Sequence, residues 1–193
     1  MTVDTGDIKD EDLARRVQGG DTESFGILVG RFEPKLLRYG RKFLSGSEDI
    51  EDIVQDVFVS AYQNIQSFDA ERAFSPWIYR IAHNAFVGEL RKRSRHPVRF
   101  FGFDFDTFVP HPVHEKTREP ESEQAEMRTL IEKGLSKIPS SASEILILHY
   151  LEDLSYAQIA DVLRIPIGTV SVRLMRAKQA LKLNAAELKN AYD

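Results

Sequence analysis

The fold of the C-terminal part is decided by residues 154–177, which read LSYAQIADVLRIPIGTVSVRLMRA. Ser155 is followed three places later by glutamine, the spacing of a capping box at the start of a helix. The proline and glycine within residues 164–168 then predict a short break. A basic helix is expected over residues 169–183. Two short helices joined by a tight turn, the second of them basic, form the sequence signature of a helix-turn-helix.

Four apolar residues of the second helix recur at intervals of three or four: Val170, Leu174, Ala177 and Leu181. This stripe is expected to pack against the first helix, which leaves the opposite face for the major groove of DNA. On that face, Arg176 can donate a bidentate pair to guanine, and Ser171 can bond a base or a phosphate. Val172 and Met175 can contact thymine methyl groups.

Other polar groups of this segment are better suited to phosphates, which position a protein without specifying a base sequence. The basic residues expected in this role are Arg164, Arg173, Lys178 and Lys182. The helix N-terminus at Gly168 and Thr169 is expected to add free N–H donors for a backbone phosphate. A plain three-helix bundle would show the same pattern, so the helix-turn-helix needs support from the rest of the chain.

Charge is segregated along the chain, although 26 Lys and Arg against 30 Asp and Glu leave a net charge of only −4. Residues 44–71 hold seven acids and no base, whereas residues 72–99 hold seven bases and one acid. Residues 100–126 are acidic again, and residues 161–182 carry five bases against one acid. Solvated helix faces would explain any one block. Two separate basic blocks favour two contacts with polyanions.

Composition excludes or disfavours several classes of protein. Cys is absent, which excludes disulfides, thiolate metal sites and cysteine nucleophiles. No apolar run approaches the roughly 18 residues that span a bilayer, and the acidic N-terminus lacks the pattern of a signal peptide. We therefore expect a cytoplasmic protein. Its 193 residues leave room for one domain or two small ones.

The N-terminal part, residues 1–96, is predicted to be a helical domain. Asp21 is expected to cap the second of its helices, and Pro34 to kink or split that helix. The apolar face of the third helix includes Tyr62, and Ser75 followed by proline is expected to begin the fourth. Apolar residues recur at helical spacing in residues 8–17, 25–43, 50–65 and 77–90.

Residues 97–122 are predicted to be an acidic, aromatic linker, because they contain four prolines and no helical periodicity. Five phenylalanines fall within residues 100–108. An exposed run of this kind would promote aggregation, so we expect it to dock on one of the chain's own domains or to anchor a partner. His111 and His114 make only a weak metal pair. A second helical domain is expected over residues 123–193.

Four motifs follow one another along the chain. They are EDIVQDVF at 51–58, FSPWIYRIAHN at 74–84, LSYAQIA at 154–160 and GTVSVRLMRA at 168–177. Together they resemble bacterial sigma factors of the extracytoplasmic-function (ECF) type, and the resemblance covers nearly all of residues 8–183. It implies an all-α protein with two small helical domains, sigma domains two and four. It also implies a promoter-specificity factor that binds RNA polymerase core and recognises and opens promoter DNA, with no enzymatic activity and no cofactor.

In the family that these motifs resemble, the stretch at 51–58 docks on the clamp helices of RNA polymerase. The resemblance assigns this role to Asp52, Gln55 and Asp56. These residues lie off the apolar stripe of an acidic helix, which suits a basic partner surface. The alternative is that they only solvate the helix. Contacts with the polymerase flap and with an anti-sigma factor are implied by the resemblance alone.

The resemblance places recognition of the minus-ten element in the loop after this helix and in the next helix. A base flipped from the nontemplate strand enters a pocket there, to which Phe68, Asp69 and Asn84 correspond. Aromatic rings that stack bases and basic residues that follow the backbone suit strand capture. Trp77 is expected to be buried and Tyr79 to be the exposed ring. The remaining minus-ten candidates are Tyr79, Arg80, Arg91 and Arg93.

Two positions depart from the family pattern. Ser171 and Val172 stand where the family often has a basic residue followed by serine, so the base sequence read at the minus-thirty-five element is not inferred. His83 stands where arginine is common, so its role is left open. The minus-thirty-five candidates are Arg164, Thr169, Ser171, Val172, Arg173, Met175, Arg176 and Lys178.

Two other functions compete with this interpretation. The first is a helix-turn-helix regulator that binds duplex DNA without polymerase core, although the acidic helix at 51–58 argues against it. The second is a metal-dependent enzyme that uses a group of carboxylates as ligands for a hard cation. Those carboxylates would be Glu48, Asp49, Asp52 and Asp56. No second acidic helix, glycine-rich phosphate loop or Ser-His-Asp set accompanies them.

Overall fold

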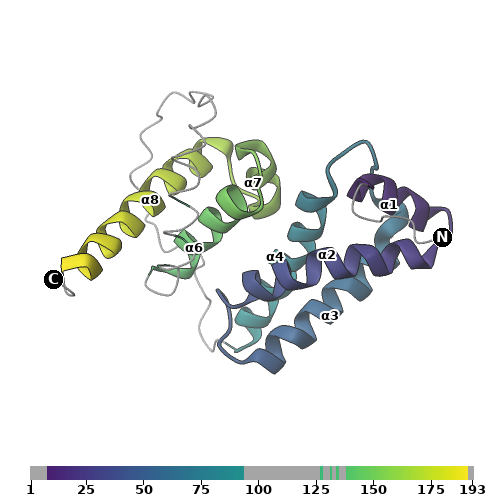
Figure 1. The fold of residues 1–193 in the computed structure, drawn as a ribbon, viewed down its shortest axis with the longest axis horizontal. Helices are drawn as coiled ribbons and strands as arrows, with labels where there is room; N and C mark the ends of the chain where they lie inside the picture. The colour runs from purple at the N-terminus through teal and green to yellow at the C-terminus, as the bar shows by residue number, and fades with distance from the viewer. Residues whose placement is uncertain (1–7, 94–126, 128–130, 132–133, 135–137, 191–193) are drawn as a thin grey trace. The chain divides into compact units, whose positions relative to one another are not determined.

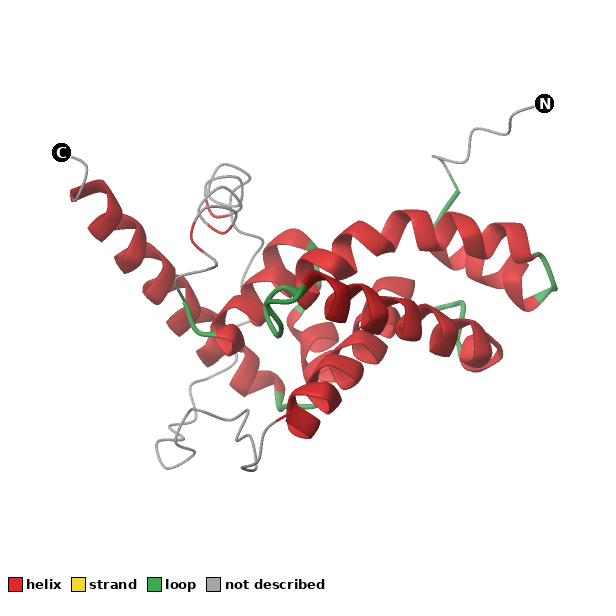
Figure 2. Ribbon diagram, turned by 90° about the horizontal axis from the view of Figure 1, so that it is seen from below, coloured by secondary structure: helices red, strands yellow, loops and turns green. Residues whose placement is uncertain are grey.

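A computed structural model describes residues 8–93 and 138–190, together with residues 127, 131 and 134. The chain divides into two compact units, residues 1–96 and residues 97–193, and each is described by itself. Within the described ranges every regular element is helical (Figures 1 and 2). The predicted linker and its aromatic run, with His111 and His114, lies outside the described residues.

Residues 8–93, the described part of the first unit, form four α-helices and one short 3-10 helix (Figure 1). Helix α1 packs against α2, while α3 packs against both α2 and α4. The 3-10 helix follows α3 directly and opens the loop that leads to α4. The elements are α1 Asp10–Gln18, α2 Thr22–Gly40, α3 Ser47–Asn64, η2 Ile65–Ser67 and α4 Phe74–Arg93.

Helix α2 begins as predicted. The carboxylate of Asp21 accepts hydrogen bonds from the backbone N–H groups of Glu23 and Ser24, at 3.0 and 3.2 Å, which confirms it as the N-cap. Hydrogen bonds from the Ser24 hydroxyl and N–H hold the pKa of Asp21 below its usual range. Pro34 lies inside α2 without dividing it, so the helix runs as one element from Thr22 to Gly40.

The core of the first unit is rich in aromatic rings. Tyr39 of α2 contacts Tyr79 of α4 edge to face at 5.2 Å, and Phe43 stacks on Phe86 at the same distance between ring centroids. Gly40 lies against this cluster, because a Cβ atom there would be 2.5 Å from Cζ of Phe86. A larger residue at position 40 would therefore force α2 and α4 apart.

Helix α4 begins two residues earlier than an N-cap at Ser75 predicts. Ser75 was expected as the N-cap, but α4 starts at Phe74. The backbone N–H of Phe74 donates to Oε1 of Glu11 in α1, at 2.9 Å. A carboxylate 63 residues away thus satisfies the first backbone donor of the helix, which no residue close in sequence is predicted to satisfy.

The second unit contains the predicted helix-turn-helix. The capping box of Ser155 and Gln158 is present at the start of α7 and confirms that prediction. Helix α7 ends at Arg164, whose backbone is left-handed with φ of 52°. The elements are α6 Ser140–Leu146, a π-helical turn η5 Ile147–Leu151, α7 Tyr156–Leu163 and α8 Ile167–Asn190.

Helix α8 packs against both α6 and α7 through the stripe predicted from the sequence. All four of its apolar residues are buried: Val170, Leu174, Ala177 and Leu181. Met127, Ile131 and Gly134 are also helical and buried, and a Cβ atom on Gly134 would lie 2.7 Å from Cδ1 of Leu181. Gly134 therefore lies directly against α8. In the described part of the chain, none of the helices combines the length and apolar character that crossing a bilayer needs.

Candidate protein and nucleic-acid interfaces

The outer face of α3 carries the three residues predicted to dock a partner. Asp52, Gln55 and Asp56 are all exposed, whereas the opposite face is buried in the core. Val59 and Tyr62 continue the same face at the next two helical turns and are 54% and 44% exposed. These five residues, the α3 stripe, combine two carboxylates and an amide with two apolar side chains.

Tyr62 corrects the sequence-based prediction, which put it on the buried face of α3. Its ring contacts the ring of Phe25 in α2 edge to face at 5.0 Å, but almost half of the side chain remains exposed. A residue at the border of a broad apolar face fits either assignment by periodicity. Tyr62 continues the exposed face that begins at Asp52, and the apolar periodicity alone does not reveal this.

Phe68 does not offer its ring to solvent. The side chain is 5% exposed and lies between Phe74 and Trp77, with centroid distances of 5.4 and 5.2 Å. The expectation that Phe68 stacks on a flipped base is therefore wrong for the ring in this arrangement. Asp69 beside it is exposed, accepts a hydrogen bond from the N–H of Glu71 at 3.1 Å and pairs with Arg72 at 3.3 Å.

The two rings at the start of α4 exchange their predicted roles. Tyr79 is fully buried against Tyr39, while Trp77, expected in the core, is half-buried. The two residues are two positions apart and therefore point about 200° apart around the helix, so a packing of α4 that buries one of them turns the other toward the surface.

Trp77 shares one face of α4 with three predicted minus-ten candidates. Arg80 and Asn84 follow it at intervals of three and four, and Arg91 lies two turns beyond Asn84. Arg80 is half-buried, and Asn84 and Arg91 are exposed. We call Trp77, Arg80, Asn84 and Arg91 the α4 stripe; of the predicted group Phe68, Asp69 and Asn84, the ring of Phe68 is buried, whereas Asp69 and Asn84 are exposed.

His83, whose role was left open, lies on the inner edge of α4. Its Nδ1 atom is 3.5 Å from the hydroxyl of Tyr39, and the imidazole is half-buried. His83 therefore belongs to the contact between α2 and α4 rather than to the exposed stripe.

Arg93 is engaged in ion pairs at the basic end of α4. Its guanidinium donates to Asp49 at the start of α3 and to Glu89 one turn earlier, both at 2.8 Å. The hydrogen bonds from Arg93 lower the pKa of both carboxyls, and those carboxylates raise the pKa of Arg93. A DNA phosphate would have to displace these carboxylates, so Arg91 is better placed than Arg93 for a backbone contact.

The face of α8 opposite its buried stripe carries the predicted base-reading residues. Met175 is 44% exposed and Arg176 is exposed, while Ser171 and Val172 are half-buried beside them. The structure thus brings these four residues together on one helix face, at positions 171–176.

The residues of the second unit that are predicted to contact phosphates differ in exposure and in their hydrogen bonds. The N–H of Thr169 donates to the carbonyl of Pro166 at 2.9 Å, so the expectation that it is a free donor is wrong. Arg173 is half-buried; burial lowers its pKa, and the carboxylate of Glu144 opposes that shift. The ammonium of Lys178 lies 5.7 Å from the centre of the Tyr150 ring. Arg164 is exposed at the turn between α7 and α8.

Comparison with known proteins identifies both units. The family model of sigma-70 region 2 matches residues 28–96, and that of sigma-70 region 4 matches residues 128–181. The chain is 30% identical over 178 residues to the ECF RNA polymerase sigma factor SigW of Bacillus subtilis, covering 90% of this chain and 95% of that protein. It is 32% identical to the ECF RNA polymerase sigma-E factor of Haemophilus influenzae, covering 91% and 94%. The chain belongs to the ECF RNA polymerase sigma factors.

Solved structures agree with this assignment. The sigma factor matches the structure of CnrH in complex with the cytosolic domain of CnrY with a TM-score of 0.62 and 26% identity, covering 95% of this chain and 99% of that one. It shares its fold with RpoE of Bartonella quintana, solved in complex with the anti-sigma factor NepR, with a TM-score of 0.61 at 23% identity.

Membership of the family decides between the competing functions. A sigma factor is a promoter-specificity subunit that binds RNA polymerase core and directs transcription initiation, and it is not an enzyme. The first unit of this sigma factor contains the region 2 match and the second contains the region 4 match. A regulator with a helix-turn-helix alone would not need region 2. Where the structure describes the chain, no group of three acidic or histidine side chains could hold a metal ion.

Proposed function

We propose that the α3 stripe is the surface on which this sigma factor docks on the clamp helices of RNA polymerase core. The stripe presents the carboxylates of Asp52 and Asp56 toward a partner, with Val59 and Tyr62 exposed beyond them. Acidic groups favour a basic partner surface and speed association, while exposed apolar side chains gain free energy when a partner covers them. This mixture on one helix face is the observation that carries the proposal.

Opening of the minus-ten element is assigned to the loop at 68–73 and to the α4 stripe. Trp77 is the half-buried ring of this region, and Asp69 and Asn84 present polar groups that can bond a base edge. Arg80 and Arg91 lie on the same face of α4 and suit the sugar-phosphate backbone.

Recognition of the minus-thirty-five element is assigned to α8. Arg176 and Met175 reach outward from the middle of that helix, with Ser171 and Val172 at its start. Arg164 and Lys178 flank these residues and are assigned to phosphates, which fix the register of the helix on the duplex. Contact of this unit with the polymerase flap belongs to the same proposal.

An anti-sigma protein is the further partner in this proposal. CnrH is similar to this chain over 95% of its length and was solved with the cytosolic domain of another protein, CnrY. A partner of that kind would cover surfaces that polymerase otherwise uses, and the exposed α3 stripe is one such surface. The proposed place of action is the cytoplasm, where polymerase and promoter DNA are found.

Charge reversal on α3 tests the docking surface. Asp56→Lys should weaken binding to RNA polymerase core at least about ten-fold, since a like charge then faces the basic partner surface. Glu33→Lys, which reverses an exposed carboxylate on α2, is the matched control and should bind as the wild type does. Affinity is measured by titration of core against labelled protein, with helix content checked by circular dichroism. Equal affinities for the two variants would refute the docking assignment.

A further inference from the structure

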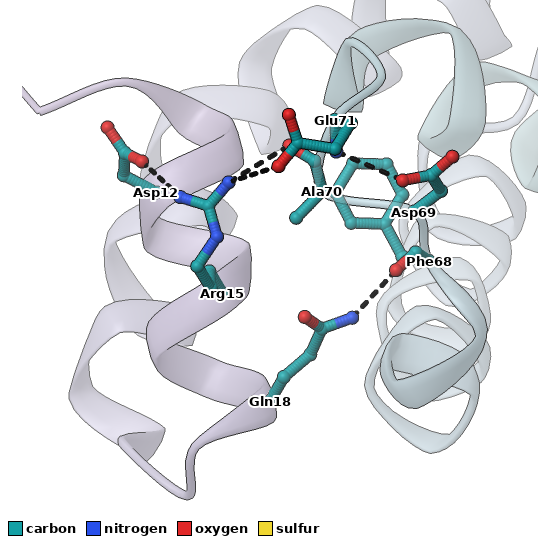
Figure 3. A network of polar contacts seen from close by, with 7 residues as sticks. All are labelled: Asp12, Arg15, Gln18, Phe68, Asp69, Ala70 and Glu71. Atoms are coloured by element: carbon teal, nitrogen blue, oxygen red, sulfur yellow. Dashed lines mark hydrogen bonds and ion pairs between the residues drawn. The ribbon is translucent and has the colours of Figure 1, made fainter.

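The loop between α3 and α4 is held from behind by helix α1. Gln18 is the last residue of α1, and its side-chain amide donates to the carbonyl of Ile65 at 2.8 Å. The same amide donates to the carbonyl of Phe68 at 2.7 Å (Figure 3). The amide of Gln66 returns a hydrogen bond to the backbone carbonyl of Gln18 at 2.9 Å. One side chain of α1 therefore fixes the beginning of the loop at two backbone positions.

Arg15, one turn earlier on α1, holds the middle of the loop. Its guanidinium donates to the carbonyl of Ala70 and pairs with Glu71, both at 3.3 Å, and it is oriented by Asp12 of the same helix (Figure 3). Glu11 accepts the N–H of Phe74, where the loop ends and α4 begins. We call the three residues Glu11, Arg15 and Gln18 the α1 clamp.

Helix α1 is itself well anchored. Leu13 and Ala14 are fully buried, and Val17 is nearly so. Arg31 of α2 donates to the carbonyl of Ile8 at 2.7 Å and pairs with Asp10 at the start of α1. Because α1 is fixed in the packed core, a side chain of α1 that contacts the loop holds the loop in a defined position.

The contacts of the clamp fall mainly on the loop's backbone, and the charged side chains of the loop remain largely exposed. Asp69, Glu71 and Arg72 keep 59%, 87% and 81% of their side chains exposed. Simple stabilisation of a surface loop does not require three residues of a distant helix, two that bind its carbonyls and one that binds the N–H of Phe74 directly after it. Rigid support with outward side chains is what a loop needs if it must present groups to a ligand in one geometry.

We propose that the α1 clamp positions the loop at 68–73 for capture of the flipped minus-ten base, with Gln18 and Arg15 as positioning residues. This inference rests on the proposed role of that loop in promoter opening. Without Gln18 the carbonyls of Ile65 and Phe68 lose their donor, and the loop samples other conformations. Binding of the flipped base then has to order the loop as well, and this cost lowers the affinity for the base. It also reduces the difference in affinity between the correct base and other bases.

Substitutions in the clamp test the proposal in the full-length protein bound to polymerase core. Gln18→Met keeps the length and volume of the side chain and removes both donors, and Gln18→Glu places a carboxylate against two carbonyls. Permanganate reactivity of a duplex promoter should fall about ten-fold for each, since each loses two hydrogen bonds. Arg15→Ala should also reduce opening, whereas Arg16→Ala, which removes an exposed charge from the same helix, should not.

The decisive readout is base selectivity. Each holoenzyme is titrated with a single-stranded minus-ten oligonucleotide and with copies that carry a change at one base. The ratio of the affinity for the unchanged oligonucleotide to the affinity for each changed copy is then compared between variants. The clamp variants should have smaller ratios than the wild type while binding core with unchanged affinity. Unchanged opening and ratios for Gln18→Met and Arg15→Ala would overturn the proposal, as would a uniform loss on every oligonucleotide. Failure of the wild-type protein to bind core or open DNA would instead refute the proposed function.

Discussion

The ring centroids of Phe68 and Trp77 lie 5.2 Å apart, but the two side chains differ in their exposure to solvent. Phe68 is 5% exposed, whereas Trp77 is half-buried at the start of the α4 stripe. Phe68 therefore anchors the loop in the core, and Trp77 presents part of its indole at the surface. In the proposed function, the buried ring of Phe68 serves stability, and the partly exposed ring of Trp77 serves DNA binding.

The anchoring role predicts a large loss of stability in Phe68→Ala. Removal of a buried phenylalanine typically costs about 3–5 kcal/mol, because contacts are lost and a cavity remains. The free energy of unfolding, measured by urea denaturation followed by circular dichroism, should fall by about this amount. A decrease below about 1 kcal/mol would show that the ring is not packed as described.

The DNA-binding role predicts a different result for the α4 stripe. Asn84→Ala removes an exposed amide, so its free energy of unfolding should change by less than about 0.5 kcal/mol. Trp77→Ala should cost more stability but leave core binding intact, and both variants should reduce permanganate-detected opening. A template with a premelted bubble should restore much of the transcription. If the bubble gave no rescue, the stripe would not act in strand opening.

Two cations of α8 should differ in what they recognise. Arg176→Ala should weaken binding by about 1–3 kcal/mol at one base pair of the minus-thirty-five element and relax selectivity there. Lys178→Ala should weaken binding to all sequences and reduce the salt dependence, because a phosphate contact releases counterions. Holoenzyme affinities for a set of single-base promoter variants at several salt concentrations distinguish the two. Equal losses on every sequence would make Arg176 a phosphate contact as well.

The ion pairs of Arg93 predict a dependence of stability on pH. Hydrogen bonds from Arg93 lower the pKa values of Asp49 and Glu89 below their ordinary 3.8 and 4.5. Lowered carboxyl pKa values contribute stability above the ordinary values and lose it as the pH falls through the folded-state values. The melting temperature of the wild type should therefore exceed that of Arg93→Ala at about pH 7, and the difference should shrink as the pH falls below the ordinary carboxyl pKa values. A difference that persists in acid would contradict this assignment.

Much of the fold was predictable because its signals are local. The caps at Asp21 and Ser155 depend on residues two or three positions away, and the buried stripe of α8 follows the helical period. The exposure of Asp52 and Asp56, the proposed docking residues, could also be predicted, because acids opposite an apolar stripe point toward solvent.

Other features of the candidate site have no local signal. The exchange of roles between Trp77 and Tyr79 depends on a rotation of α4 that only its packing fixes. The hydrogen bonds of Gln18 join residues 47 and 50 positions apart, so no spacing rule reveals them. The engagement of Arg93 likewise depends on Asp49, which lies 44 positions earlier in the chain.

Run-off transcription with purified polymerase core tests the central claim most directly. The protein is mixed with core, the complex is isolated by size exclusion, and transcripts from genomic DNA fragments of the source organism are mapped at their 5′ ends. The account predicts co-elution with core and transcripts with defined starts that core alone does not produce, both diminished by Asp56→Lys and not by Glu33→Lys. Binding of duplex DNA by the protein without co-elution and without defined transcripts would contradict it.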